Sequence, residues 1–359
     1  MADKKRIKVC VIFGGQSPEH DISCISAASV INNLNKEKYR IITIGITKKG
    51  EWFLYKGKTS RIENGEWKKD SKNLKKAIIS PDAKDKAIFV FDEDKIKKIK
   101  PDIVFPVLHG EYGEDGTIQG LLELAEMKYV GMGVCSSANA MDKSFTKIIF
   151  KNAGIPQADW ITVNAYELEN INETVLRVEK EIGYPCFVKP TSTGSSVGVG
   201  KAKNKKELIS ALKNAVKYGR KILVEENIDG HEVECSVLGN VNPKAATVGE
   251  IIPEVEFYDF DAKYKTGTTK LQIPAKLPTG IINQIKEYAV RAFKALDGMG
   301  LARVDFFVRY KDNSIVLNEI NTMPGFTSIS MYPKLWEAVG KKYSELLDEL
   351  IVLGMNRVK

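Results

Sequence analysis

The order of apolar and polar residues along the chain predicts alternating strands and helices. Short runs rich in Val, Ile and Phe are typical of strands, whereas apolar residues that recur every three or four positions are typical of helices. Strands are expected at residues 8–13, 40–46, 87–91, 103–107, 186–190, 221–226, 232–238, 245–252, 303–308 and 318–325, and helices just after residue 19 and at 136–153, 204–217, 279–296 and 334–353. This order predicts the α/β class.

The composition is that of an ordinary globular protein of two or three domains, with 359 residues, 43% hydrophobic and 28% charged. The formal net charge is +8, from 54 Lys and Arg against 46 Asp and Glu. The Lys-rich segments 56–76 and 84–100 lack interleaved aromatic residues that could stack on bases. We therefore expect small anionic substrates and no nucleic acid as partner.

Cellular location and redox state are also indicated. No apolar stretch is long enough for a signal peptide or a membrane span, so we expect a cytoplasmic protein without a membrane partner. The five cysteines are scattered, odd in number and without CxxC spacing. This pattern favours reduced thiols over a zinc site or a disulfide framework.

Residues 303–308 and 318–325, joined by a polar turn, predict a β-hairpin. If the turn is centred on Asp312, then Asp305 lies opposite Glu319 and Arg303 opposite Asn321, so that all four side chains share one face. A turn shifted by half a residue would move Glu319 to the other face, so an odd-length loop is part of the prediction. Two carboxylates and an amide oxygen suit Mg²⁺. The alternative is a surface salt bridge of Arg303.

Two further positions stand where open α/β sheets bind ligands. The turn after the first strand lacks a full GxGxxG, so it does not indicate a dinucleotide site. Glu19 is expected at a helix N-terminus, where the helix dipole favours a carboxylate and where it could receive an ammonium group or only stabilise the helix. His109 begins a polar loop at the carboxyl end of a strand, with a structural role as the alternative to a catalytic one.

The glycine-rich segment 191–200 follows a predicted strand that carries Lys189. Its backbone N–H groups and hydroxyls could hold phosphate oxygens, with Lys189 adding positive charge, while the alternative is a flexible turn. A Walker A ending is missing, which indicates a different nucleotide-binding architecture. The polar and aromatic segment 257–269 is typical of a lid over an active site.

Together these motifs resemble the D-alanine–D-alanine ligase family of the ATP-grasp superfamily, over essentially the whole chain. The resemblance is carried by residues 14–19, 109–117, 141–143, 188–198, 258–264, 302–305 and 318–325, in the order and approximate spacing of the family. It implies an α/β ATP-grasp fold with an N-terminal open parallel-sheet domain. The implied domains are residues 1–133, a central ATP-grasp subdomain at 134–225 with the glycine-rich loop, and a C-terminal subdomain at 226–359 with the lid and the metal site.

The resemblance also implies an activity and its cofactors. In this family ATP phosphorylates the carboxylate of one D-alanine, and the amine of a second D-alanine attacks the acyl phosphate, which supplies peptidoglycan precursors. The implied ATP-binding residues are Lys143 and Lys189 for the phosphates, Glu225 for the adenine amino group, Glu232 for the ribose, and Ser196, Glu226 and Ile228. The implied ligands of two Mg²⁺ ions, for which Mn²⁺ can substitute, are Asp305, Glu319 and Asn321.

The same resemblance assigns the amino-acid subsites. It implies that Glu19 holds the ammonium of the first D-alanine and connects through Ser195 to Tyr264 on the lid, and that His109 lies close to this subsite. It also implies that Arg303 and the N–H of Gly325 form an oxyanion hole. The carboxylate of the second D-alanine is implied to bind Lys263, Ser330 and the backbone at Met331. Homodimers are usual in the family, so a homodimer is expected by analogy.

The acceptor is the main alternative left open. Tyr264 and residues 328–333 resemble the branch of the family that uses D-alanine as acceptor. A ligase of the same fold that uses D-serine or D-lactate is the second hypothesis. A non-catalytic nucleotide-binding protein is the third, and the presence of Lys143, Lys189 and the three predicted metal ligands argues against it.

Overall fold

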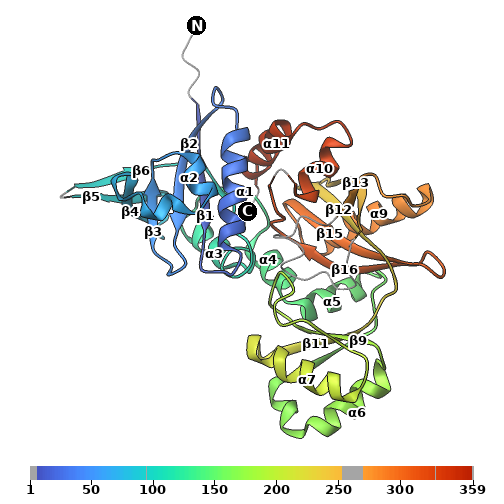
Figure 1. Ribbon diagram of the computed structural model, residues 1–359. Coiled ribbons are helices and arrows are strands. Elements are labelled where there is room, and N and C mark those ends of the chain that lie inside the picture. The colour runs from blue at the N-terminus through green and yellow to red at the C-terminus, as the bar shows by residue number, and fades with distance from the viewer. Residues whose placement is uncertain (1–5, 94, 253–269, 328, 358–359) are drawn as a thin grey trace.

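The computed structural model describes residues 6–93, 95–252, 270–327 and 329–357. Within these residues the chain forms three β-sheets, each packed against helices (Figure 1). The predicted α/β class is confirmed. The predicted lid, residues 257–269, lies outside the residues that the structure describes.

The elements occur in the following order. The strands are β1 (Ile7–Gly14), β2 (Tyr39–Ile46), β3 (Trp52–Tyr55), β4 (Leu74–Ile79), β5 (Ile88–Asp92), β6 (Lys95–Ile99), β7 (Ile103–Pro106), β8 (Trp160–Asn164), β9 (Cys186–Pro190), β10 (Gly200–Ala202), β11 (Lys221–Glu226), β12 (Gly230–Gly239), β13 (Lys244–Ile252), β14 (Lys270–Gln272), β15 (Gly300–Arg309) and β16 (Ile315–Asn321). The helices are α1 (His20–Asn33), α2 (Thr59–Glu63), α3 (Thr117–Leu124), α4 (Val134–Met141), α5 (Lys143–Asn152), α6 (Ile171–Glu181), α7 (Lys205–Ala215), α9 (Thr279–Ala295), α10 (Met331–Glu337) and α11 (Tyr343–Met355).

The N-terminal sheet has seven strands in the order β6-β5-β4-β3-β2-β1-β7. Strands β2, β1 and β7 pair in parallel, as predicted. The Lys-rich segments contribute strands to an antiparallel extension from β3 to β6, and most of their lysines are exposed. Antiparallel neighbours need no crossover connection, unlike parallel strands, and β5 and β6 follow each other closely along the chain.

The other two sheets are antiparallel. Strands β10-β9-β11-β8 form a four-stranded sheet that packs with α6 and α7 around a core of its own. Strands β14-β13-β12-β15-β16 form a five-stranded sheet. Helix α9 packs against this sheet with Ile285 and Phe293, while α10 and α11 contribute to the core that the sheet shares with the N-terminal part of the chain.

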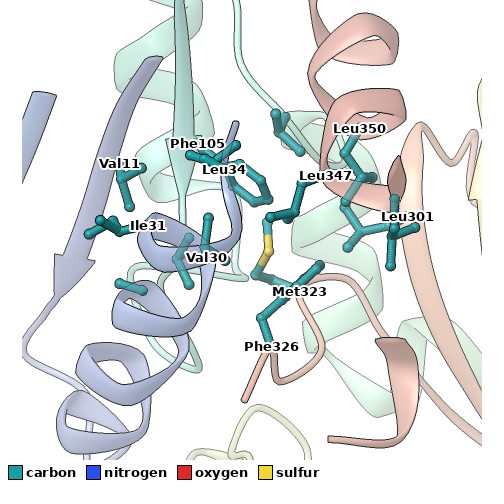
Figure 2. Packing of buried hydrophobic residues seen from close by; sticks show 14 of the residues in the cluster. Val11, Val30, Ile31, Leu34, Phe105, Leu301, Met323, Phe326, Leu347 and Leu350 are labelled. Atoms are coloured by element: carbon teal, nitrogen blue, oxygen red, sulfur yellow. The ribbon is translucent and has the colours of Figure 1, made fainter. Parts of the chain in front are cut away.

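The largest core joins the N-terminal and C-terminal sheets. Val30 of α1 and Leu34, which directly follows this helix, belong to the same buried cluster as Leu347 of α11 and Met323 and Phe326, which follow β16 (Figure 2). Helices α1 and α11 therefore lie between the two sheets and bind them to each other. The domain boundaries at residues 133 and 225 stay predictions.

Two predicted helices are each divided in the structure. The helix expected at 136–153 breaks at Asp142, which has extended backbone and accepts a hydrogen bond from the Ser144 N–H at 3.0 Å, so that Asp142 caps α5. The helix expected at 334–353 is two helices, α10 and α11, with Gly340 between them at a φ of +88°. Asn204 caps α7 and accepts a hydrogen bond from the Glu207 N–H at 3.1 Å.

The remaining global predictions concern thiols and membranes. All five cysteines are free, with Cys135 exposed and the other four buried. Burial raises the pKa of Cys24 to about 12 and that of Cys186 to about 11, which keeps both thiols protonated and unreactive. Among the residues that the structure describes, no helix combines the length and the apolar character needed to cross a membrane.

Candidate active site

The hairpin of β15 and β16 contains a β-bulge beside the predicted metal ligands. The Cα partners are Val308 with Ile315 and Phe306 with Leu317 near the turn, and Asp305 with Glu319 and Arg303 with Asn321 beyond it. The predicted pairs are confirmed, but the reason given for them was wrong. The register near the turn, if continued, would put Glu319 on the face opposite to Asp305. A β-bulge between Asp305 and Phe306 leaves Asn318 without a partner in the ladder, and this extra residue brings Glu319 opposite Asp305.

Arg303 lies between two buried carboxylates. Its Nε and Nη2 donate to Asp305 Oδ1 and Oδ2 at 2.8 and 2.7 Å, and its Nε also lies 3.0 Å from Glu234 Oε2. Asn321 Nδ2 donates to Asp305 Oδ2 at 3.0 Å. The salt bridge considered as the alternative to a metal site is therefore present, but it is buried and not on the surface. Because both ions of such a pair are desolvated, removing one partner is costly.

The oxygen ligands of the hairpin suit a metal ion that arrives with a phosphate. Among the described residues, no group of three or more His, Cys, Asp or Glu side chains could hold a metal ion. The hairpin instead offers the carboxylates of Asp305 and Glu319 and the amide oxygen of Asn321 on one face. Mg²⁺ commonly takes one or two carboxylates and completes its shell with phosphate oxygens and waters. The residues present therefore fit Mg²⁺ together with a nucleotide.

Glu19 connects the N-terminal sheet to the glycine-rich loop. It precedes α1 as its N-cap residue, as predicted, and accepts a hydrogen bond from Ser195 Oγ at 2.5 Å. Ser195 and Ser196 have φ values of +50° and +59°. These left-handed conformations are strained for residues other than glycine and occur preferentially at functional sites. In this structure the loop is thus joined to Glu19 through Ser195.

Lys147 and Glu225, which are buried, form a charged cluster with Lys189, which is half-buried. Lys189 Nζ donates to Glu225 Oε1 and lies 3.4 Å from Asn318 Oδ1, while Lys147 Nζ lies 3.1 Å from Glu225 Oε2. Burial alone would raise the pKa of Glu225, but the two lysines outweigh it and lower this pKa to about 2. Glu225 is therefore ionised throughout the physiological pH range.

Two adjoining cavities bring most of the predicted residues together. The first, of about 500 Å³, is lined among others by Glu19, His109, Lys143, Ser195, Arg303, Glu319, Asn321, Gly325, Ser330 and Met331. The second, of about 380 Å³, is lined among others by Lys143, Lys189, Ser195, Ser196, Glu225, Glu226, Ile228, Glu232 and Glu319. Of the predicted residues that the structure describes, Asp305 alone lines neither cavity. Lys263 and Tyr264 lie outside the described residues.

The lining of the first cavity includes Gly325, Ser330 and Met331. A Cβ on Gly325 would lie 2.7 Å from Ser330 Oγ, so a side chain at this position would crowd the hydroxyl. Ser330 Oγ accepts a hydrogen bond from the Thr327 N–H at 3.0 Å. Met331 begins α10, and the first N–H groups of a helix have no intrahelical acceptor. Backbone N–H groups and a hydroxyl are therefore available here for an anionic group.

His109 is engaged on both ring nitrogens. Nδ1 lies 2.9 Å from Met323 O, and Nε2 lies 3.0 Å from Ser26 Oγ. The side chain is only 4% exposed, and this burial lowers the pKa of its imidazole, which keeps the ring neutral. His109 thus ties α1 to the segment after β16. Direct binding of substrate by His109 stays a prediction.

Glu114 makes a second connection between the same parts of the chain. Its carboxyl accepts hydrogen bonds from the N–H groups of Gly110 at 3.0 Å and Met323 at 3.2 Å. Burial, assisted by the nearby charge of Glu19, raises the pKa of Glu114 to about 8. Sequence reasoning included Glu114 in a motif without giving it a function. Its position between a loop of the N-terminal sheet and the end of β16 depends on tertiary structure.

Comparison with known proteins now identifies the family. Residues 8–132 match the family described as D-ala D-ala ligase N-terminus, and residues 149–352 match the one described as D-ala D-ala ligase C-terminus. The chain belongs to the D-alanine–D-alanine ligase family. A curated relative named D-alanine–D-alanine ligase, from Thermoanaerobacter pseudethanolicus, is 54% identical over 349 residues, which are 97% of this chain and 96% of the relative.

Solved structures of similar ligases share the fold over nearly their whole length. The VanG D-Ala:D-Ser ligase from Enterococcus faecalis is 40% identical, with a TM-score of 0.89 and coverage of 98% of this chain and 100% of that one. The D-alanine–D-alanine ligase from Coxiella burnetii is 37% identical, with a TM-score of 0.83 and coverage of 98% and 94%. The expected ATP-grasp fold is thereby confirmed.

Two charged residues of this ligase-family site were missed by sequence reasoning. Lys147 is four residues after Lys143 on α5, so both side chains lie on one face of the helix. Glu234 is two residues after Glu232 on β12, so both side chains lie on one face of the strand. In each case the spacing from a predicted residue was the available signal, but only the tertiary structure shows that Lys147 reaches Glu225 and that Glu234 reaches Arg303.

Proposed function

We propose that this protein is a D-alanine–D-alanine ligase that uses ATP to join two D-alanines through an acyl phosphate, for peptidoglycan precursor synthesis. The observation that carries the proposal is the junction of the two cavities at Lys143, Ser195 and Glu319. A nucleotide in the second cavity would direct its terminal phosphate toward a carboxylate held in the first. Family membership supports the same reaction.

In this proposal the second cavity binds ATP. Lys143 and Lys189 neutralise phosphate charge, Glu225 accepts a hydrogen bond from the adenine amino group, and Glu226, Ile228, Glu232 and the loop around Ser196 hold the rest of the nucleotide. Two Mg²⁺ ions, replaceable by Mn²⁺, would be held by Asp305, Glu319 and Asn321 and would neutralise charge on the transferring phosphoryl group. The protein contributes mainly by positioning and by electrostatics, as phosphoryl transfer requires.

The first cavity binds the amino acids. Glu19, oriented by its bond from Ser195 Oγ at 2.5 Å, receives the ammonium of the first D-alanine. Arg303 and the N–H of Gly325 stabilise the oxyanion of the tetrahedral intermediate, with Arg303 kept in place by Glu234 at 3.0 Å. His109 lies beside the first subsite. Ser330 and the backbone at Met331 take the carboxylate of the second D-alanine.

The proposal also covers the lid residues, the cellular location, the oligomeric state and the number of metal ions. Lys263 and Tyr264 are assigned from the family resemblance, to the acceptor carboxylate and to the connection with Ser195. A cytoplasmic location and a homodimer are proposed because biosynthetic ligases of this family act on cytoplasmic substrates and usually pair. The number of metal ions is proposed on the same basis.

A D-Ala-D-Ser ligase is the second candidate. It is favoured by the similarity to the Enterococcus faecalis D-Ala:D-Ser ligase at a TM-score of 0.89. D-alanine is preferred as acceptor because the relatives named D-alanine–D-alanine ligase reach 47% to 54% identity, above the 40% of that structure.

Phosphate release from ATP tests both candidates. The protein is supplied with Mg²⁺ and D-alanine alone, or with D-alanine plus D-serine or D-lactate, at several pH values, and the products are identified by mass spectrometry. We expect phosphate release and D-alanyl-D-alanine with D-alanine alone. A predominant mixed product would favour the second candidate, and a lack of phosphate release under all conditions would overturn both.

A further inference from the structure

Lys147 is the most enclosed charged group of the nucleotide cavity. It projects from α5 on the same face as Lys143, one turn later. Its side chain is 3% exposed, against 20% for Lys143 and 16% for Lys189. Within the described part of the chain, no other lysine or arginine is buried. A buried cation is costly unless it is paired, and Glu225 lies within reach at 3.1 Å.

Glu225 is paired with two lysines whose side chains differ in exposure. Its Oε1 accepts from Lys189, while its Oε2 faces Lys147. Lys189 also lies 3.4 Å from Asn318 and lines the cavity beside the glycine-rich loop, so it can turn to a phosphate. Lys147 lines the same cavity, but its side chain is only 3% exposed, so it stays with Glu225. When Lys189 binds phosphate, Lys147 becomes the remaining counter-ion of the carboxylate.

The protonation state of Glu225 determines which base it can bind. An ionised carboxylate only accepts hydrogen bonds, whereas a protonated carboxyl or an amide can also donate. Adenine presents an amino group at C6, which donates, and guanine presents an oxygen at this position, which accepts. An ionised Glu225 therefore attracts adenine and repels guanine, and leaving a buried acceptor unpaired is strongly unfavourable.

We propose that Lys147 is a positioning residue that sets the adenine selectivity of the nucleotide site by keeping Glu225 an ionised, fixed acceptor. This inference rests on the proposed function, because it takes the adenine to lie against Glu225. It assigns Lys147 no contact with phosphate. The three lysines thus divide into two that neutralise phosphate, Lys143 and Lys189, and one that determines the base.

The test compares Lys147→Met, which keeps the length of the side chain and removes its charge, with Lys151→Met, an exposed position one turn further along the same helix. Binding of ADP and GDP is measured by calorimetry, and kcat and KM for ATP and GTP are measured with D-alanine. For Lys147→Met we expect the preference for ADP over GDP, and for ATP over GTP in kcat/KM, to fall at least tenfold, mainly through KM. Lys151→Met should keep the wild-type preference.

If the single variant does not fold, the test uses a double variant, Lys147→Met with Glu225→Gln, which removes both charges of the buried Lys147–Glu225 pair. Its amide can donate to guanine, so GDP should bind at least tenfold more tightly than to the wild-type protein. A wild-type ratio of ADP to GDP affinity in folded Lys147→Met, or no gain of GDP binding in the double variant, would overturn the inference. Failure of the proposed function would look different: wild-type protein that binds ADP selectively but releases no phosphate with D-alanine.

Discussion

Replacing Glu114 with Gln should make the stability of the protein less dependent on pH. The Glu114 side chain is only 15% exposed, and its pKa is raised from 4.5 to about 8, first by burial and then by the charge of Glu19. The folded protein therefore binds the proton more tightly than the unfolded chain does. The stabilisation from this proton is fully present below pH 4.5 and is lost as the pH rises to about 8.

The size of the effect follows from the two pKa values. A pKa of about 8 against 4.5 corresponds to roughly 5 kcal/mol of stability lost over this interval, at about 1.4 kcal/mol per pKa unit. Gln offers one acceptor oxygen in place of two, so one of the N–H groups of Gly110 and Met323 loses its partner, at about 1–3 kcal/mol. The variant should therefore be less stable than wild type near pH 5 and more stable at pH 8, with the curves crossing between about pH 5 and 7.

Urea unfolding, followed by tryptophan fluorescence at pH 5, 6, 7 and 8, measures this difference. Groups distant from Glu114 titrate equally in both proteins and cancel in the comparison. Glu111→Gln, an exposed carboxylate in the same loop, is the matched control and should give a constant difference. If the curves of wild type and Glu114→Gln run parallel over the whole range, then Glu114 does not carry a buried proton and the reasoning is refuted.

The remaining predictions concern the metal site, the first subsite and the core. Glu319→Ala should abolish D-alanine-dependent phosphate release while leaving the circular dichroism spectrum unchanged; retained turnover would remove the hairpin from the mechanism. Ser195→Ala removes the hydroxyl that orients Glu19, so KM for the first D-alanine should rise about tenfold or more, as steady-state kinetics would detect. Gly45→Ala would place a Cβ 2.6 Å from Trp67 and should cost about 1–3 kcal/mol in urea unfolding; an unchanged midpoint would contradict this.

Much of the fold could be predicted from the sequence because the apolar pattern is strong in most elements. The breaks were harder to predict. At Asp142 the apolar pattern continues across the cap, so periodicity alone joined α4 to α5, although Asp is a favoured N-cap residue. The bulge at Asn318 gives no signal in a hairpin argument, which assumes one residue opposite another. The predicted pairing of Asp305 with Glu319 is therefore correct, but the turn register from which it was predicted differs from the one in the structure.

The site could be predicted where its residues stand in local motifs, and not where the interaction spans distant segments. Lys147 on an amphipathic helix is indistinguishable in sequence from a solvated lysine, and only the approach of α5 to β11 shows its ion pair with Glu225. His109 was expected near substrate. Its ring nitrogens bind Met323 and Ser26 because α1 and the end of β16 meet there, at sequence separations of 214 and 83 residues.

The core shared by α1, α11 and the end of β16 has a consequence for dividing the protein into fragments. A fragment ending at residue 133 would keep α1 but lose Met323, Phe326 and Leu347, which cover its apolar face. Such a fragment should aggregate through that face when expressed alone. The four-stranded sheet has a cluster of its own and is the better candidate for independent expression. Inserted sequences or tags are therefore best placed in the turns of that sheet other than the glycine-rich loop, away from the junction.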